Sequence, residues 1–134
     1  DTNGTNPAII KHLLENDLID YIAMDIKNSP EKYTLTAGFT ALTMEDINES
    51  ISLIMSGKAD YEFRTTVVSE LHTENDIETI GKWVHGAKAY YLQSYKDSGD
   101  IISPGFTSPD KHTLERFRDI LLSYVEFADI RGVD

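Results

Sequence analysis

Apolar residues along the chain recur with two alternating periods, one typical of helices and one typical of strands. Four segments have apolar positions three or four residues apart, which predicts amphipathic helices. The first covers residues 7–16 and the last runs from 108–109 through 121. The second begins at a capping sequence at 43–46 and ends at the glycine at 57, and the third begins at a capping sequence at 73–76 and ends at the glycine at 86. Four shorter segments have the length and composition of strands: 19–26, 61–68, 87–93 and 124–130. Because helices and strands alternate, we expect βα units, a mainly parallel sheet and the α/β class.

Two of the predicted strands indicate how the sheet is covered. Residues 19–26 are almost continuously apolar, as in a parallel strand that is buried on both faces. Residues 61–68 alternate, so that one face carries Phe63, Thr65 and Val67 and the other carries Glu62, Arg64 and Thr66. Segments 28–42 and 95–107 have no regular pattern. The second is either a partner-binding loop or, more simply, a variable surface loop.

The first seven residues have the sequence of a loop that leads into a helix. Asn3-Gly4 is turn sequence, and Asn6-Pro7 supplies an N-cap followed by proline at the first helical position. A loop between a parallel strand and the next helix is where α/β proteins place ligand-binding groups. Because the strand of this loop would precede residue 1, we expect the sequence to be part of a larger protein.

Composition limits the classes of function. The chain has 134 residues, which is enough for one domain with a substantial core. Its 23 acidic and 12 basic residues give a formal net charge of -11, which argues against binding to nucleic acid or to an anionic membrane. It has no cysteine, so disulfides, cysteine nucleophiles and thiolate-held clusters are excluded within these residues. No segment approaches the roughly 20 apolar residues of a membrane span and no signal-peptide pattern is present, so we expect a cytoplasmic protein.

Asp25 and Lys27 stand at the C-terminal end of the first apolar strand, and under strict alternation they share one side of it. A carboxylate that closes a buried strand needs a partner, and the simplest one is a structural contact or a salt bridge to a helix. If the strand before residue 1 is its neighbour, Asp1 and Asp25 converge at the ligand-binding rim. That convergence instead suggests a bound cation or an amine-bearing ligand.

Arg64 lies in the middle of the second strand, where a guanidinium needs a carboxylate. That carboxylate belongs either to a ligand or to an internal partner, Glu62 or Asp25. Gln93 ends the next strand and offers one polar contact to the same cleft. The four histidines show no metal-ligand spacing, and phosphate-loop, dinucleotide and serine-nucleophile motifs are absent. We therefore expect no catalytic residue in this chain by itself.

Three short motifs at the predicted strand ends resemble a known family. Residues 1–4 (Asp-Thr-Asn-Gly), 21–27 (Tyr-Ile-Ala-Met-Asp-Ile-Lys) and 63–68 (Phe-Arg-Thr-Thr-Val-Val) are similar to those of the radical S-adenosylmethionine activating enzymes. The nearest resemblance is to the anaerobic ribonucleoside-triphosphate reductase activating proteins, and pyruvate formate-lyase activating enzyme is a cousin. Further likeness in residues 25–33 and 64–93 extends the resemblance over most of the chain.

The resemblance implies the C-terminal part of a partial (β/α)6 barrel, with residues 1–134 as one domain and the cluster-binding N-terminal part absent. S-adenosylmethionine would lie across the C-terminal ends of the strands. Its contacts would be Thr2, Asn3, Gly4, Lys27, Arg64 and Gln93. A monovalent cation beside its carboxylate would be held by Asp1, Thr2 and Asp25.

The resemblance also implies a reaction. In this family a 4Fe-4S cluster on a CxxxCxxC motif receives an electron, for which flavodoxin or ferredoxin is the expected donor. A 5′-deoxyadenosyl radical then removes a hydrogen from a glycine of the partner, a glycyl-radical enzyme that in the nearest group is anaerobic ribonucleotide reductase. This chain departs from the pattern, because it has no cysteine and no histidine at Gln93 to Tyr95, where the cousins carry one. We expect these residues alone to hold no cluster and to be inactive.

Two other interpretations stay open. One is a radical enzyme that acts on a small molecule, such as a deazaguanine-forming synthase. The other is a cysteine-free, non-catalytic binding module of the same fold. In each case a half barrel exposes an unpaired sheet edge, so we also expect self-association through the edge near residues 20–26.

Overall fold

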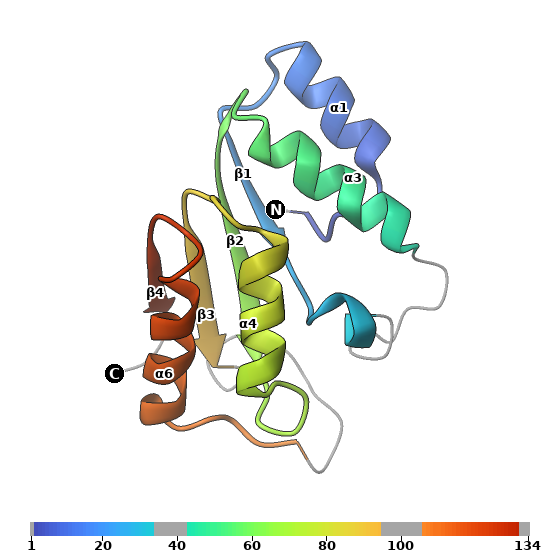
Figure 1. Cartoon of the computed structure of the whole chain (residues 1–134). Coiled ribbons are helices and arrows are strands. Elements are labelled where there is room, and N and C mark those ends of the chain that lie inside the picture. Colours follow the sequence, from blue (N-terminus) through green and yellow to red (C-terminus); the bar gives the residue numbers. More distant parts are fainter. Residues whose placement is uncertain (1, 34–42, 95–105, 132–134) are drawn as a thin grey trace.

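A computed structural model describes residues 2–33, 43–94 and 106–131. Helices and strands alternate through these ranges (Figure 1). In chain order they are α1 (Pro7–Glu15), β1 (Tyr21–Asp25), the 3-10 turn η1 (Pro30–Lys32), α3 (Met44–Met55), β2 (Asp60–Val67), α4 (Glu74–Trp83), β3 (Tyr90–Ser94), α6 (Lys111–Leu121) and β4 (Ala128–Arg131). Within the described ranges, no helix is both long and apolar enough to cross a membrane.

The four strands form one parallel sheet in the order β1-β2-β3-β4, which is also their order in the sequence. The helix that connects two neighbouring parallel strands crosses the sheet in a right-handed sense. When each new strand is added on the same side of the previous one, all of these connecting helices lie on the same face of the sheet. The helices accordingly lie together on one side of the sheet (Figure 1). The predicted α/β class and the parallel sheet are confirmed, and the opposite face of the sheet, here called the open face, is left for other side chains.

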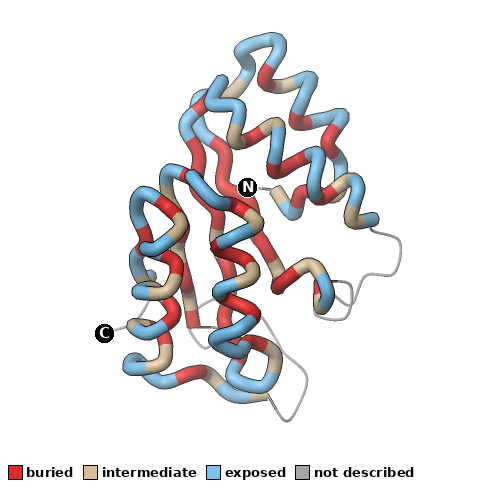
Figure 2. Tube along the Cα trace, viewed as in Figure 1, coloured by how far each residue is buried: buried red, intermediate tan, exposed pale blue. Residues whose placement is uncertain are grey.

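The core lies between the sheet and this layer of helices. Alternate strand residues such as Met24, Phe63 and Leu92 are fully buried there, against helix residues that include Ile77 and Leu114. Figure 2 shows the buried positions along the strands and on the sides of the helices that face the sheet. The predicted alternation of β2 is confirmed from Phe63 onward, since Phe63, Thr65 and Val67 are buried while Arg64 and Thr66 are half-buried. Glu62, predicted on the same face as Arg64, is buried as well.

Three helix starts follow the predicted capping chemistry and the fourth differs. At α1, Asn6 accepts a hydrogen bond from Ile9 N and Pro7 is the first helical residue. Thr43 accepts a hydrogen bond from Asp46 N, and at α4 Thr73 and Asp76 form a complete capping box. The last helix was expected from 108–109 but begins at Lys111. The reason is that Asp110, whose carboxylate accepts from Thr113 N, is the better N-cap.

Three strands begin later than predicted, and the first of them, β1, begins at Tyr21 instead of residue 19. Strand β3 begins at Tyr90 instead of residue 87, because Ala87 is bonded in a turn, donating to Val84 O and accepting from Glu126 N. Strand β4 begins at Ala128 instead of residue 124, because Tyr124 N is bonded to Leu121 O at the end of α6. Strand β4 also extends to Arg131, one residue beyond the predicted end.

The outer edge of β1 is paired to Thr2. Thr2 N donates to Ala23 O at 2.9 Å and Asp25 N donates to Thr2 O at 3.0 Å, which makes a parallel bridge opposite Met24. The C-terminal half of this edge is therefore covered by the chain's own first turn. Self-association through residues 20–26 stays a prediction, for which the measurement is the light-scattering mass at high concentration.

Candidate functional site

The open face carries polar side chains in rows that cross the strands. Asp25, Arg64 and Tyr91 are register partners on β1, β2 and β3. One row nearer the C-terminal ends of the strands, Thr66 is level with Gln93, and Gln93 with Arg131. Register partners in a sheet point to the same side. The fold thus brings side chains from strands far apart in the sequence to one face and one end of the sheet.

Three of the residues that the sequence singles out are in direct contact; they are here called the rim, and consist of Asp25, Lys27 and Arg64. Asp25 Oδ1 lies 3.2 Å from an Arg64 guanidinium nitrogen, and Asp25 Oδ2 lies 3.8 Å from Lys27 Nζ. The predicted proximity of Asp25 and Lys27 is confirmed, and Arg64 pairs with Asp25, whereas Glu62 pairs with Arg131. The rim has two cationic groups and one anionic group, and its side chains are 25–41% exposed. It therefore carries one net positive charge that a ligand carboxylate can reach.

The turn before α1 lies beside the rim. Thr2 meets Asp25 through its backbone carbonyl, while its hydroxyl accepts a hydrogen bond from Gly4 N at 3.0 Å. The side chain of Asn3 is bonded to Thr5 within the same turn. Gly4 has φ +75°, a left-handed backbone conformation that favours glycine, and a Cβ at this position would overlap Met24 Cε.

Two predicted site residues remain, Gln93 and Asp1. Gln93 lies on the open face one row beyond Arg64, and Asp1 lies outside the described residues. Among the described residues, no group of three or more His, Asp and Glu side chains is arranged to hold a metal ion. The monovalent-cation site expected from Asp1, Thr2 and Asp25 remains a prediction.

The backbone beneath the rim is held by three buried side chains from different segments. Asp25 O accepts from the Tyr33 hydroxyl at 3.3 Å, Ile26 O accepts from Thr65 Oγ1 at 2.7 Å, and Lys27 O lies 2.8 Å from His72 Nε2. A carbonyl can only accept a hydrogen bond, so the imidazole proton is on Nε2. Burial raises the pKa of the Tyr33 hydroxyl to about 12, which keeps it a donor at neutral pH.

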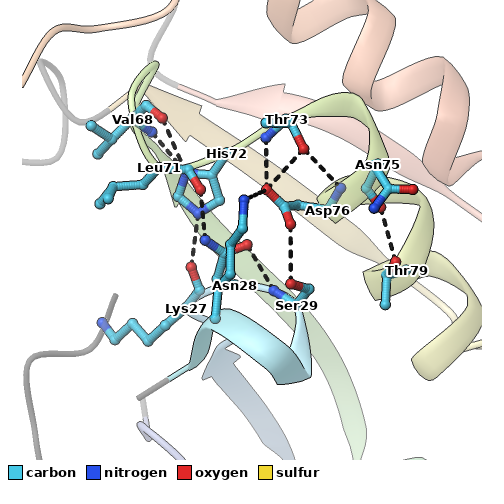
Figure 3. A network of polar contacts seen from close by, with 11 residues as sticks. Lys27, Asn28, Ser29, Val68, Leu71, His72, Thr73, Asn75, Asp76 and Thr79 are labelled. Carbon is cyan, nitrogen blue, oxygen red and sulfur yellow. Dashed lines mark hydrogen bonds and ion pairs between the residues drawn. The ribbon is translucent and has the colours of Figure 1, made fainter. Parts of the chain in front are cut away.

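His72 belongs to a polar network that joins the loop after β1 to the loop before α4 (Figure 3). Its Nδ1 accepts from Val68 N at 3.0 Å, and nearby Asn28 Nδ2 donates to Leu71 O at 2.7 Å. The imidazole is 4% exposed, and this burial lowers the pKa of His72 below its usual range. The neutral Nε2–H tautomer satisfies both bonds at once.

Asp76 closes the other side of this network. Its carboxylate accepts from Ser29 Oγ at 3.1 Å, from Lys32 Nζ at 2.8 Å and from both the amide and the hydroxyl of Thr73 at 2.9 Å. Burial opposes ionisation of Asp76, but the bonds from Lys32 and Thr73 outweigh it and lower the pKa of this carboxyl. A charged Asp76 is therefore an integral part of the loop.

A second ionic cluster on the open face was missed by sequence reasoning; it is here called the face cluster, and consists of Tyr21, Glu62, Tyr91 and Arg131. Arg131 donates two hydrogen bonds to Glu62, at 2.6 and 3.0 Å, and the Tyr21 hydroxyl donates a third. The Arg131 guanidinium lies 3.6 Å from the centre of the Tyr91 ring. The signal that could have found it is the alternation of β2, which places Glu62 on the face of Arg64.

The comparisons with known proteins concern the chain as a whole. No protein-family model matches the chain. It is 32% identical, over 139 aligned positions, to a curated protein of Methanocaldococcus jannaschii whose name provisionally assigns it as a glycyl-radical enzyme activating enzyme. That alignment covers the whole chain, and the chain spans 58% of the relative. A crystal structure of a domain of pyruvate-formate lyase-activating enzyme from Bacteroides vulgatus has a TM-score of 0.74 at 16% identity, covering 98% of this chain and 79% of that domain, which shows a shared fold.

Proposed function

We propose that the rim binds the methionine carboxylate of S-adenosylmethionine and that the chain forms part of a radical S-adenosylmethionine enzyme that activates a glycyl-radical enzyme. The observation that carries this proposal is the rim itself. Arg64 and Lys27 meet at one partly exposed carboxylate, Asp25, at the C-terminal end of a parallel sheet. Ligands of parallel α/β sheets bind at this end, and a guanidinium recognises a carboxylate through two parallel N–H bonds.

In this proposal each residue has a defined part. Arg64 and Lys27 bind the carboxylate, and the turn of Thr2, Asn3 and Gly4 lies along the methionine moiety, with Gln93 as a further polar contact. Asp1, Thr2 and Asp25 hold a monovalent cation beside the same carboxylate. The exposure of the rim side chains and their one net positive charge support this assignment.

The residues present do not fit the 4Fe-4S cluster that the family uses. The donor set of such a cluster is thiolate, and the chain has no cysteine. The cluster would therefore be held by residues outside this sequence, and the chain alone would not generate the radical. Iron and sulfide reconstitution of these 134 residues tests this point, since a stable cluster absorbance would contradict it.

Titration calorimetry with two ligands that differ only in the carboxylate tests the proposed binding. The chain is expected to bind S-adenosylmethionine and to bind its decarboxylated analogue much more weakly. Arg64→Gln is expected to weaken the binding of S-adenosylmethionine about 30-fold, because it removes a charge-assisted hydrogen bond. Arg116→Gln, on the exposed surface of α6, is the matched control. Equal affinity for the two ligands would exclude carboxylate recognition by the rim.

The cation is tested in the same experiment by replacing potassium or sodium with choline. Binding of S-adenosylmethionine is expected to weaken in choline chloride, because choline cannot enter a carboxylate-lined site. Asp25→Asn should remove this dependence, since it removes a negative ligand of the cation. Affinity that does not depend on the cation would rule out this part of the proposal.

The finer proposal concerns the partner. Similarity to a relative that is named for glycyl-radical enzyme activation supports a glycyl-radical enzyme as the target. The sequence resemblance favours anaerobic ribonucleotide reductase, with flavodoxin or ferredoxin as the electron donor. The full-length protein that carries this chain is expected to capture purified ribonucleotide reductase and not pyruvate formate-lyase. The reverse preference would place the chain with another group of activating enzymes.

A further inference from the structure

We infer that His72 is a positioning residue for the rim: by fixing the carbonyl of Lys27 it holds the backbone from which Lys27 projects beside Asp25. For its ligand the inference rests on the proposed binding of S-adenosylmethionine. His72 reaches Lys27 from a different loop, 45 positions along the chain, and its hydrogen bond is to the backbone carbonyl of that residue. Figure 3 shows the Lys27 carbonyl directed at the imidazole and the Lys27 side chain directed away from the network.

The need for such a residue follows from where the strand ladder stops. The bond from Ile26 N to Arg64 O, at 2.7 Å, lies at the end of the β1–β2 ladder. Beyond it the carbonyl of Lys27 has no neighbouring strand to hold it among the described residues. A lysine on an unsupported backbone would lose its fixed position relative to Asp25, and a binding site loses affinity when its groups are not held in place.

His72 is itself held firmly enough to serve this purpose. It is almost fully buried, and Val68 N donates to its Nδ1, so the ring links the end of β2 to the end of β1. The charged groups that face it are Asp76 and Lys32, and these two pair with each other at 2.8 Å. Because their charges are opposite, their electrostatic effects on the imidazole partly cancel. The ring therefore acts mainly through its hydrogen bonds to Lys27 and Val68.

Two substitutions distinguish the hydrogen bond from His72 to Lys27 O from the hydrogen bond that His72 accepts from Val68 N. The amide of glutamine reaches the place of Nε2, and the shorter amide of asparagine reaches only the place of Nδ1. His72→Gln can therefore keep the donor to Lys27 O, whereas His72→Asn keeps the acceptor for Val68 N and loses Lys27. His112→Asn, on the exposed first turn of α6, is the control for the substitution itself.

The experiment combines amide hydrogen exchange of residues 27–29 with calorimetry of S-adenosylmethionine, both on the 134-residue chain. His72→Asn is expected to raise the exchange rates about tenfold and to weaken binding about tenfold, which is the usual effect of one lost hydrogen bond. His72→Gln is expected to stay near the wild type in both measurements. A residue that only stabilised its own loop would give similar changes in the two variants.

Each outcome decides the inference. The inference is overturned if the exchange rates rise equally in both variants or rise in neither. It is also overturned if the exchange rates of His72→Asn rise while its affinity for S-adenosylmethionine is unchanged. If the wild type binds no S-adenosylmethionine while the exchange rates separate as expected, the proposed function fails and the positioning of the backbone stands. Imidazole 15N shifts of the unaltered chain provide a test without any substitution, because a proton on Nδ1 instead of Nε2 would also overturn the inference.

Discussion

Two arginine–carboxylate pairs lie on the same open face of the sheet, and they differ in almost every physical respect. In the face cluster, Glu62 is 4% exposed and receives two hydrogen bonds from Arg131 and one from Tyr21. In the rim, Asp25 is 40% exposed and lies 3.2 Å from Arg64. Glu62 lies toward the N-terminal end of β2 and its partner Arg131 is the last residue of β4, whereas Asp25 is at the C-terminal end of β1.

The difference shows which pair is structural and which can serve a ligand. The carboxylate of Glu62 is already surrounded by three donors, so a ligand could enter only by displacing them. The rim has more positive than negative charge, and it is open to solvent and held from beneath by buried side chains. A paired charge that is buried supports the fold, whereas a fixed and exposed surplus of charge is the form that a binding site takes.

The largest expected effect is on stability. Arg131→Met should lower the free energy of unfolding by ~3 kcal/mol, because it leaves the buried carboxylate of Glu62 without its main partner. Arg64→Met should lower it by less than about 1 kcal/mol, because both members of that pair are partly exposed. Urea unfolding of the two variants measures the difference, and equal losses would remove the distinction between the two pairs.

A double variant checks the reason for this effect. Glu62→Gln combined with Arg131→Met removes both charges, so no ion is left buried alone. Its free energy of unfolding should return to within about 1 kcal/mol of the wild type. A double variant as unstable as Arg131→Met would show that the arginine acts through packing on Tyr91 and not through its charge.

Much of the rim could be predicted from the sequence, because local rules determine it. Alternation and the end of an apolar run place Asp25 and Lys27 together, and the helix–strand order makes β2 the neighbour of β1, which brings Arg64 to them. The face cluster depends on Arg131, which lies 69 positions after Glu62 and one residue beyond the predicted end of the last strand. No periodicity connects two residues that meet only through tertiary structure.

The support beneath the rim was also invisible in the sequence. Tyr33 falls in a segment without regular pattern, and His72 lies in a loop with no metal-ligand spacing. Both act on backbone carbonyls, which every residue possesses, so the identity of their partners gives no signal. Such contacts follow only from the closure of the loops onto one another.

The next expected effect is a dependence of stability on pH. It is specific to the support beneath the rim, which contains His72, because the face cluster has no histidine. The pKa of His72 is lowered in the folded state, so between that value and about 6.5 the unfolded state binds more protons. Stability should therefore fall as the pH decreases through this window. His72→Gln should lack this loss, while Arg131→Met should keep it. Thermal unfolding at a series of pH values makes the measurement, and an identical pH dependence in His72→Gln would assign the loss to another group.

The smallest effect is that of salt on the two ion pairs. A double-mutant cycle on Asp25 and Arg64 should give a coupling of about 0.5 kcal/mol at low ionic strength and almost none in 1 M sodium chloride, because exposed charges are screened. A cycle on Glu62 and Arg131 should keep most of its coupling, since solvent ions cannot approach a buried carboxylate. Urea unfolding of the four members of each cycle at both salt concentrations makes the comparison. If both couplings fell in the same proportion, the carboxylate of Glu62 would be accessible to ions in solution, and the open face would have to be regarded as one continuous charged surface that includes the rim.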